Sequence, residues 1–187
     1  RYYELMIVFF GPAGAGKSVQ GQILAARQNW RWLSAGQILR DTHDPEIVKT
    51  MHEGNLIPHD AITRIMGEAI LKAGDIDQII LDGFPRQLEQ AQWLLESKTH
   101  HGRAIGIVIV LEVPREELLR RLKIRGRVDD TPEAIDQRLA IYRQEMYPIL
   151  GLFADNHVPV VHVDGVGTVG EIHDRIYAEL QSRGLAA

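Results

Sequence analysis

A glycine-rich stretch near the start of the chain, GPAGAGKS at Gly11–Ser18, has the residue types and spacing of a phosphate-binding loop. It fits the pattern G-x-x-x-x-G-K-[ST], in which glycines let backbone N–H groups converge on an anion and the following helix adds its dipole. Lys17 should reach the terminal phosphates of a nucleotide, and the Ser18 hydroxyl can be offered to Mg²⁺. The loop predicts a bound phosphate and leaves open whether that phosphate is hydrolysed, used as a switch or transferred.

A carboxylate follows a second apolar stretch, in LDGFPR at Leu81–Arg86. Asp82 can hold the water shell of Mg²⁺, the role of the aspartate that ends a buried strand in phosphate-binding-loop enzymes. The alternative role for Asp82 is to cap the helix that follows.

Arginines gather in the segment RLKIRGRVDD and just beyond it. Arg121 and Arg125 are four residues apart, on one face of a predicted helix, and Arg127 follows two residues later. Arg138 lies in the next predicted helix, which begins cleanly with a threonine cap and a proline. Guanidinium groups present a planar fork that matches phosphate oxygens, so these positions are candidates for phosphate contacts.

The elements that must position these residues alternate between short apolar runs and helical patterns, which predicts parallel βαβ units and a sheet covered on both faces. The predicted strands are Leu5–Phe10, Trp32–Leu33, Gln78–Leu81, Ile105–Leu111 and Val158–Val163. The predicted helices are Lys17–Gln28, Gln87–Ser97, Arg115–Ile124, Glu133–Tyr147 and Val169–Ser182. Two inserts interrupt the alternation, a mostly helical one at 34–73 without a strand and a short polar turn at 125–131. Both should lie at the edge of the sheet where open α/β sheets bind ligands.

Composition limits the function further. The 187 residues are one domain's worth of chain, and 45% of them are hydrophobic, enough for a substantial core. The absence of cysteine excludes disulfides, thiolate zinc sites and a cysteine nucleophile, and it fits a reducing cytosol, so we expect a cytoplasmic protein. The net charge of −4 does not suggest a nucleic-acid partner, although 16 of the 21 basic residues are arginine. Base composition of the genome is the other explanation for that excess.

Membrane and export signals are also missing from the sequence. No apolar run approaches the roughly 20 residues that span a bilayer, so we expect no membrane partner. No basic segment followed by an apolar one indicates a secretory signal. The chain starts at Arg1, so we expect at least an initiator methionine to precede it.

Taken together, these segments resemble the adenylate kinase family of nucleoside monophosphate kinases. The resemblance rests on the following blocks, which occur in the family's order over nearly the whole chain: GPAGAGKSVQ, LSAGQILR, EGNLIP, LDGFPRQLEQ, RLKIRGRVDDTPEAIDQRL and, more weakly, VDGVGT. It implies a P-loop NTPase fold of class α/β, a three-layer sandwich with a central parallel five-stranded sheet. It also implies one domain, 1–187, with a core (1–33, 74–124, 132–187), a helical insert for the nucleoside monophosphate (34–73) and a very short lid (125–131).

The resemblance implies roles for individual residues. ATP would be bound by Gly11, Pro12, Ala13, Gly14, Ala15, Gly16, Lys17, Ser18, Val19, Arg121, Arg125 and Gly167, with Arg121 against the ATP base. The acceptor, AMP, would be bound by Ala35, Arg40, Ile57, Gly83, Arg86, Gln90, Arg127 and Arg138. The catalytic set would be Lys17, Arg86, Arg125, Arg127 and Arg138. Mg²⁺ with ATP is the implied cofactor, held by Ser18 and, through water, by Asp82.

Four positions, in two segments, depart from the family's pattern. Ser18-Val19 stands where the family usually has Gly-Thr, which moves the hydroxyl one residue earlier and leaves metal binding intact with altered geometry. Gln37 stands where the family usually has an aspartate. With Ser34 it fits a capping box for the helix that begins there, so we expect a structural role. Ala35, usually threonine, is also found in the UMP/CMP kinases.

Two residues, Gln90 and Ala35, give different predictions for the base of the acceptor nucleotide. Gln90 is the adenylate kinase choice, because its amide suits an adenine edge, whereas Ala35 points to a pyrimidine. Hydrogen bonds to a base edge discriminate more strongly than one methyl or hydroxyl group of a pocket wall. We therefore predict ATP + AMP = 2 ADP, with a UMP/CMP kinase as the alternative. A P-loop protein that holds ATP without transferring it is a further alternative, and the segment LDGFPR argues against a kinase of a small alcohol.

Both inserts are short: thirteen residues separate Arg40 from Gly54, and the lid has no room for a metal site. We expect no zinc, and we expect His43, His52 and His59 to be surface residues. The predicted partners are ATP and a nucleoside monophosphate, and the predicted state is a monomer.

Overall fold

The computed structural model describes residues 4–74, 76–96, 102–128 and 130–187. Its centre is a five-stranded sheet in the order β2-β3-β1-β4-β5, and every paired strand is parallel to its neighbour. The strands are β1 (Leu5–Phe10), β2 (Arg31–Ser34), β3 (Gln78–Asp82), β4 (Ala104–Glu112) and β5 (Val160–Asp164). The α/β class and the parallel five-stranded sheet are thus confirmed.

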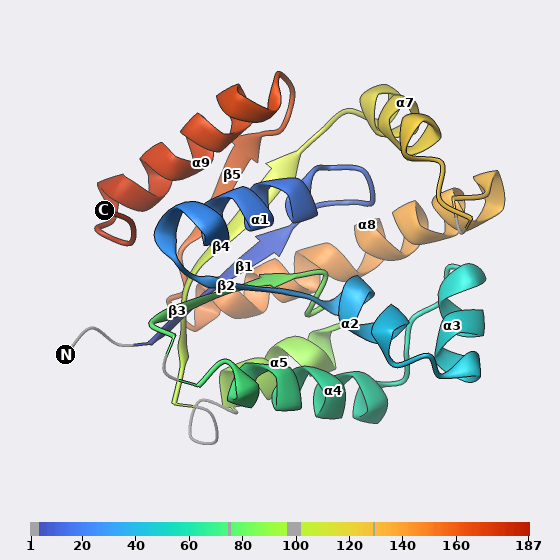
Figure 1. Cartoon of the computed structure of the whole chain (residues 1–187), viewed down its shortest axis with the longest axis horizontal. Coiled ribbons are helices and arrows are strands. Elements are labelled where there is room, and N and C mark those ends of the chain that lie inside the picture. Colours follow the sequence, from blue (N-terminus) through green and yellow to red (C-terminus); the bar gives the residue numbers. More distant parts are fainter. Residues whose placement is uncertain (1–3, 75, 97–101, 129) are drawn as a thin grey trace.

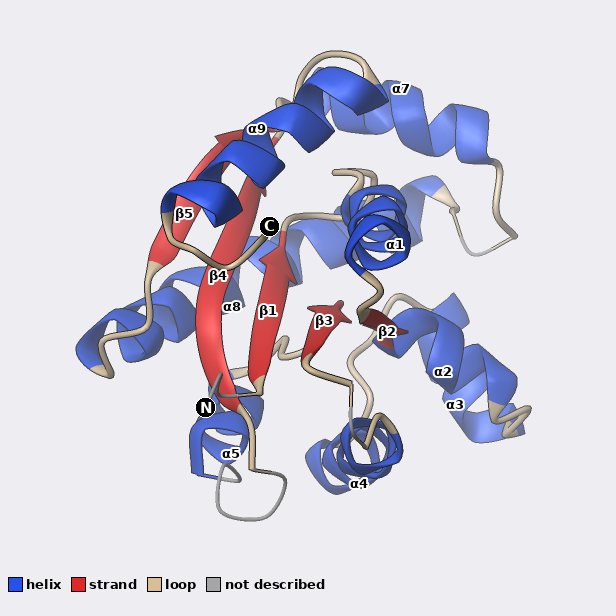
Figure 2. Cartoon of the chain, turned by 60° about the vertical axis from the view of Figure 1, so that its left-hand side comes forward, coloured by secondary structure: helices blue, strands red, loops and turns tan. Residues whose placement is uncertain are grey.

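Helices cover both faces of the sheet, because alternate residues of the central strand point to opposite sides. Met6 and Val8 of β1 belong to the hydrophobic cluster under α4 (His59–Lys72), α5 (Leu88–Glu96) and α8 (Pro132–Asp155). Ile7 and Phe9 belong to the cluster under α1 (Lys17–Gln28), α7 (Arg115–Arg125) and α9 (Val169–Ser182). Figure 2 shows α9 in front of the sheet and α8 behind it, so the molecule has three layers.

The register of the strands brings their functional ends together. Asp82, the last residue of β3, lies opposite Phe9 of β1 on one side and Ser34 of β2 on the other. The glycine loop starts two residues after Phe9. Because parallel strands present their carboxyl ends at one edge, the loop, Ser34 and Asp82 meet at the edge where such sheets bind ligands.

The insert between β2 and β3 is helical and contains no strand within its described residues, 34–74, other than the last residue of β2. Its helices are α2 (Ala35–Asp41), α3 (Pro45–His52) and α4. Asp44 caps α3 by accepting hydrogen bonds from the backbone N–H groups of Glu46 and Ile47. Figure 1 shows α2 and α3 on the same side of the molecule as α7 and the start of α8.

The helix α8 is longer than predicted. The expected helix ended at Tyr147, but α8 continues through Pro148 to Asp155 and has 24 residues in all. Proline removes one backbone donor, yet Pro148 and Gln144, whose carbonyl loses its partner, are both exposed, so water can replace the bond. The helix continues because Ile149 and Phe153 are completely buried, and Phe153 packs edge-on against Phe10 with ring centroids 6.3 Å apart.

Several other boundaries differ by one or two residues from the sequence expectation, including those of β5 and α5. Strand β5 begins at Val160 rather than Val158, because the ring nitrogen of Pro159 has no hydrogen to donate to a neighbouring strand. Helix α5 ends at Glu96, and Ser97, the expected last residue, lies outside the described residues. None of the described helices combines the length and the hydropathy needed to cross a membrane.

Candidate active site

The glycine loop between β1 and α1 forms a tight turn that depends on its glycines. Gly14 and Gly16 have φ angles of 87° and 98°, in the region that favours glycine, and a Cβ atom on Gly14 would come within 3.0 Å of Leu122. The amide of Ala15 donates to the carbonyl of Pro12 at 3.1 Å. Gly16 caps α1 without a side chain, so the first N–H groups of that helix remain available to an anion.

Lys17 begins α1 and folds back over the loop. Its ammonium donates to the carbonyls of Gly11 at 2.7 Å and Pro12 at 3.0 Å. Burial lowers the pKa of Lys17 to about 8, and the nearby charges of Arg86 and Arg125 act in the same direction against the attraction of Asp82. A bound phosphate would add negative charge beside this partly buried ammonium.

Ser18 and Asp82 form the second feature of the site. The Ser18 hydroxyl donates to the Asp82 carboxylate at 2.6 Å, and only 3% of Asp82 is exposed. A hydroxyl and a carboxylate oxygen are the hard ligands that Mg²⁺ prefers, directly or through water, so these two side chains fit the ion. Because Ser18 gives its one proton to Asp82, the lone pairs of its oxygen remain open.

One cavity of about 710 Å³ runs along the carboxyl edge of the sheet. Its walls include every residue that the sequence analysis assigned to ATP, to the acceptor or to the metal, namely Gly11, Pro12, Ala13, Gly14, Ala15, Gly16, Lys17, Ser18, Val19, Ala35, Arg40, Ile57, Asp82, Gly83, Arg86, Gln90, Arg121, Arg125, Arg127, Arg138 and Gly167. Its volume is in the range of small-molecule sites. The fold thus gathers residues from well-separated segments of the chain into one place.

At one end of the cavity, Arg86 is held by its own loop. Its side chain donates to the carbonyl of Gly83 at 2.9 Å, and its backbone N–H donates to the side-chain oxygen of Gln90 at 2.7 Å. Although part of Arg86 is open to solvent, its enclosure in the cavity lowers the pKa of the guanidinium; Asp82 opposes this effect, and Arg138 and Arg40 add to it. Gln90 is buried and is part of the cavity wall, and its amide nitrogen donates to the side-chain oxygen of Gln87 at 3.1 Å.

At the other end, Arg121 is braced against the glycine loop rather than left free. It donates to Glu117 at 2.7 Å, to the carbonyl of Gly165 at 2.8 Å and to that of Ala15 at 3.3 Å. Hydrogen bonds from Arg120 and then Arg121 lower the pKa of Glu117 to about 2. Sequence reasoning did not single out Glu117, although its position four residues before Arg121 in a helix is a signal for such a pair.

Asp130 is the second acidic residue that sequence reasoning missed. Its side chain is 2% exposed, accepts two bonds from Arg125 at 2.8 and 2.5 Å, and accepts one from Arg138 at 3.2 Å. Burial raises the pKa of the Asp130 carboxyl, but Arg125, the backbone of Arg127 and the charge of Arg138 together hold the pKa below its usual value. Arg138 also donates to the backbone carbonyl of Met51 at 3.2 Å, which ties α8 to α3.

Five further residues of α8 also line the cavity and were not predicted to do so: Ile141, Tyr142, Glu145, Met146 and Ile149. They follow Arg138 at helical spacing, which is the only signal in the sequence that could have found them.

The capping-box prediction for Gln37 is half wrong. Ser34 does cap α2, since its hydroxyl accepts the Gln37 N–H at 3.3 Å. The Gln37 side chain does not return to Ser34. Its amide nitrogen donates to Asp41 at 2.8 Å, and its oxygen accepts from Arg40 at 3.3 Å, because residues three and four positions apart share one face of a helix.

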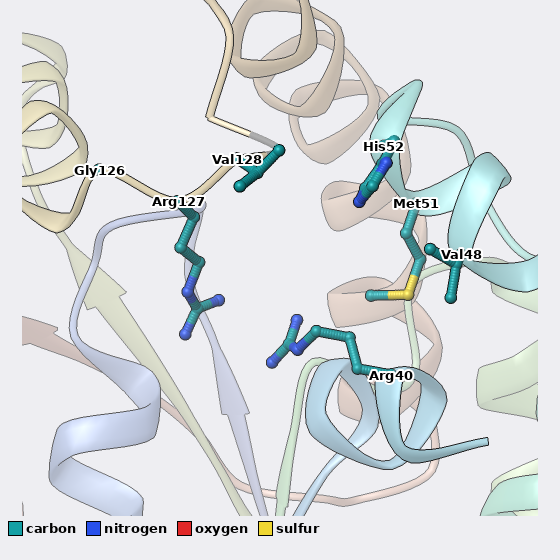
Figure 3. A pocket seen from close by; sticks show the side chains of 7 residues that line it. All are labelled: Arg40, Val48, Met51, His52, Gly126, Arg127 and Val128. Carbon is teal, nitrogen blue, oxygen red and sulfur yellow. The ribbon is translucent and has the colours of Figure 1, made fainter. Parts of the chain in front are cut away.

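A smaller cavity of about 440 Å³ lies between α3 and the turn after α7. Figure 3 shows Arg40 and Arg127 pointing toward each other from opposite walls, with Met51 beside them. His52 also lines this cavity and is exposed, as is His43, whereas His59 is only partly exposed. Across the described residues, no group of three or more histidines and carboxylates is arranged to hold a metal ion.

Comparison with known proteins gives concordant matches. A family model described as adenylate kinase matches residues 9–158. The chain is similar to an adenylate kinase of Thermus thermophilus, with 39% identity over 185 residues that cover 93% of this chain and 96% of the relative. It is also similar to the adenylate kinase of Mycolicibacterium paratuberculosis, with 34% identity over 94% of this chain and 99% of the relative. An adenylate kinase of Porphyromonas gingivalis is 36% identical over 92% of this chain and 93% of the relative.

Proposed function

Because the chain belongs to the adenylate kinase family and is a phosphotransferase with that activity, we propose that its large cavity holds ATP and AMP end to end, with the residues predicted from the sequence in the roles given above. The observation that carries this proposal is the cavity itself, in which the glycine loop, Asp82 and the predicted arginines line one connected space.

In the proposed reaction, an oxygen of the AMP phosphate attacks the terminal phosphorus of ATP. The new bond forms as the bond to the ADP leaving group breaks, and both products are ADP. The attacking oxygen is already an anion, so no general base is needed, and the described site offers cations instead. Phosphoryl transfer has a loose transition state with charge spread over the equatorial oxygens, so positioning and positive charge supply most of the catalysis.

Different residues are proposed to bind the donor phosphates, the acceptor phosphate and the group in transfer. The loop amides and Lys17 hold the donor phosphates, and Arg40 and Arg86 hold the phosphate of the acceptor. Arg125, Arg127 and Arg138 surround the group in transfer. Ser18 and Asp82 would hold Mg²⁺, which when bound shields the charge of the donor phosphates.

We propose that the insert (34–73) and the short lid (125–131) close over the core when both nucleotides are bound. Closure removes water, which would otherwise compete with AMP as the acceptor. The bond between Arg138 and the Met51 carbonyl supports a coupled movement, because it joins the root of the lid to the insert.

AMP is the proposed acceptor, with Gln90 contacting the adenine and Ala35 and Ile57 forming the wall of the base pocket. Ala35 is 2% exposed and has no hydroxyl to offer a base, which is the observation that favours UMP or CMP as the second candidate. We also propose a zinc-free, cytoplasmic monomer, because the sequence has no cysteine and its substrates are cytoplasmic metabolites.

A panel of acceptors tests the proposal. The purified protein is incubated with ATP, Mg²⁺ and one of AMP, CMP, UMP, GMP or dAMP, and ADP formation is followed. AMP should give the highest kcat/KM, and ATP alone should be consumed only slowly. A preference for UMP or CMP would replace the acceptor assignment, and ATP binding without transfer to any acceptor would defeat the mechanism.

A further inference from the structure

The arginines of the large cavity differ in what orients them. Four of them are paired with carboxylates: Arg120 and Arg121 with Glu117, and Arg125 and Arg138 with Asp130. Arg40 and Arg86 are oriented by neutral oxygens instead, the amide oxygen of Gln37 at 3.3 Å and the carbonyl of Gly83 at 2.9 Å. In the described part of the chain, neither forms an ion pair within 4.0 Å.

The Gln37 amide is fixed by a second bond. Its nitrogen donates to the Asp41 carboxylate at 2.8 Å, which requires the oxygen end of the amide to face the other way, toward Arg40. Gln37 thus stands between a carboxylate and a guanidinium, and Asp41 is engaged with the amide rather than with Arg40.

The backbone beside this network leaves room for the guanidinium. A Cβ atom at Gly36 would lie 3.4 Å from a terminal nitrogen of Arg40, so the absence of a side chain there lets Arg40 lie along α2. Figure 3 shows the end of Arg40 directed into the smaller cavity, toward Arg127. Arg40 lines both cavities, so it borders the space where the acceptor phosphate is proposed to bind.

We propose that Gln37 is a positioning residue for the acceptor phosphate: it orients Arg40 through a neutral amide and leaves the positive charge of Arg40 unneutralised. The inference rests on the proposed function, because it takes Arg40 as a phosphate contact. A carboxylate in the same place would form an ion pair with Arg40 and compete with the phosphate for its N–H groups. With Gly83 orienting Arg86 in the same neutral way, the acceptor end keeps two full positive charges for a phosphate that carries a charge close to −2.

The experiment compares Gln37→Glu and Gln37→Ala with the wild type by equilibrium binding of AMP and of ATP to the free protein, together with kcat and KM. Glutamate keeps the shape of glutamine and adds a charge, so it should weaken AMP binding about ten-fold, and alanine should weaken it about three-fold. ATP binding should stay within about two-fold of the wild type. Because Arg40 holds the phosphate equally in the ground and transition states, KM for AMP should rise while kcat changes little.

The salt dependence of AMP binding supplies a readout that a purely structural role would not move. The wild type should lose AMP affinity with rising ionic strength more steeply than Gln37→Glu, because its acceptor end carries one more net positive charge. Gln181→Glu, at an exposed position near the end of α9, is the matched control for the added charge and should bind both nucleotides as the wild type does.

Two results would overturn the inference: AMP binding by Gln37→Glu equal to that of the wild type, or an equal weakening of AMP and ATP. A rise in kcat in Gln37→Glu with unchanged AMP binding would assign the position to the metal site instead. These failures are distinct from a failure of the proposed function, which would appear as normal turnover in an Arg86→Ala variant.

Discussion

At the scale of single residues, the site contains two kinds of cation: arginines paired with carboxylates, and cations bonded to neutral oxygens. Asp130 and Glu117 hold four arginines in place, so those guanidinium groups are ordered before a nucleotide arrives. Among the residues that the structure describes, the hydrogen-bond acceptors of Lys17 are all carbonyl oxygens. The site is therefore preorganised around the donor loop and left electrostatically incomplete at the positions where phosphate is proposed to bind.

The lowered pKa of Lys17 predicts that ATP binding depends on pH. Below pH 8 the ammonium is protonated and can bind the triphosphate; above its pKa of about 8 the free protein loses this charge. ATP affinity should be constant near pH 7 and fall by up to about ten-fold for each pH unit above 8, since the bound state requires the proton. Calorimetric titration between pH 6.5 and 9.5 measures this.

The Lys17→Arg variant is the control for this pH profile, because a guanidinium stays protonated throughout the range. Its ATP affinity should be lower but independent of pH. A profile that bends in the same way in both proteins would assign the titration to another group.

Arg86→Ala should lower turnover by roughly two to three orders of magnitude, because it removes a cation from the proposed acceptor site. Steady-state kinetics measures the loss, and circular dichroism should show an unchanged fold. Arg64→Ala, which removes an exposed arginine of α4 paired with Glu68, should leave kcat/KM unchanged. Full activity of Arg86→Ala would show that this side chain does not hold the acceptor.

At the scale of elements, the insert is fastened to α8 at two adjacent points. Arg138 reaches the Met51 carbonyl at the end of α3, and Gly54, with φ of 76°, lies against the backbone of Ala134. A Cβ atom on Gly54 would be 3.1 Å from the Ala134 carbonyl oxygen. The junction therefore depends on glycine both for its backbone conformation and for close approach.

Gly54→Ala should lower the free energy of unfolding by roughly 1–3 kcal/mol, since alanine at positive φ is strained and its methyl group crowds α8. Urea denaturation measures the change. Gly151→Ala is the matched control, because Gly151 is exposed within α8 and has open space around its Cβ position. That substitution should raise stability by about 0.5–1 kcal/mol, and a similar loss in both variants would contradict the account of the junction.

The sequence predicted most elements because their patterns are local. Leu5–Phe10, Lys17–Gln28 and Val169–Ser182 agree with the structure at both ends, since an apolar run, a glycine and a capping threonine mark them. The second half of α8 could not be predicted locally, because Pro148 is a helix breaker whose cost here is reduced by solvent and opposed by the burial of Phe153.

The candidate site was predictable where a motif carries it and not where tertiary contacts do. Each residue taken from the motifs lines the large cavity. The role of Asp130 was missed because it depends on two arginines, five and eight residues away, turning toward one carboxylate. The side chain of Gln37 was misassigned because a sequence pattern cannot decide between a return to Ser34 and a bond to Arg40.

At the scale of the whole molecule, the core covers both faces of the sheet, and the insert (34–73) and the lid (125–131) lie at one edge. Bound nucleotides should therefore stabilise the insert and the lid. A compound that joins ATP to AMP, present at about 100 times its Kd, should stabilise the protein by about 2.7 kcal/mol and raise Tm by roughly 5–10 °C. Hydrogen exchange should slow in α2, α3 and residues 126–128, as well as in the glycine loop. Slowing confined to the glycine loop would contradict the proposed closure.

The helix α8 connects the two ends of this arrangement. From Pro132, just after the lid, to Phe153, the helix rises about 32 Å. Phe153 contacts Phe10, the residue just before the glycine loop. The number of residues between Arg138 and Phe153 therefore sets the position of Arg138 relative to the glycine loop. One residue inserted between Arg138 and Phe153 would rotate the guanidinium by about 100° around the axis. A change in the length of the lid or of the insert leaves this spacing within α8 unchanged, whereas a change in the length of α8 moves Arg138 relative to the glycine loop.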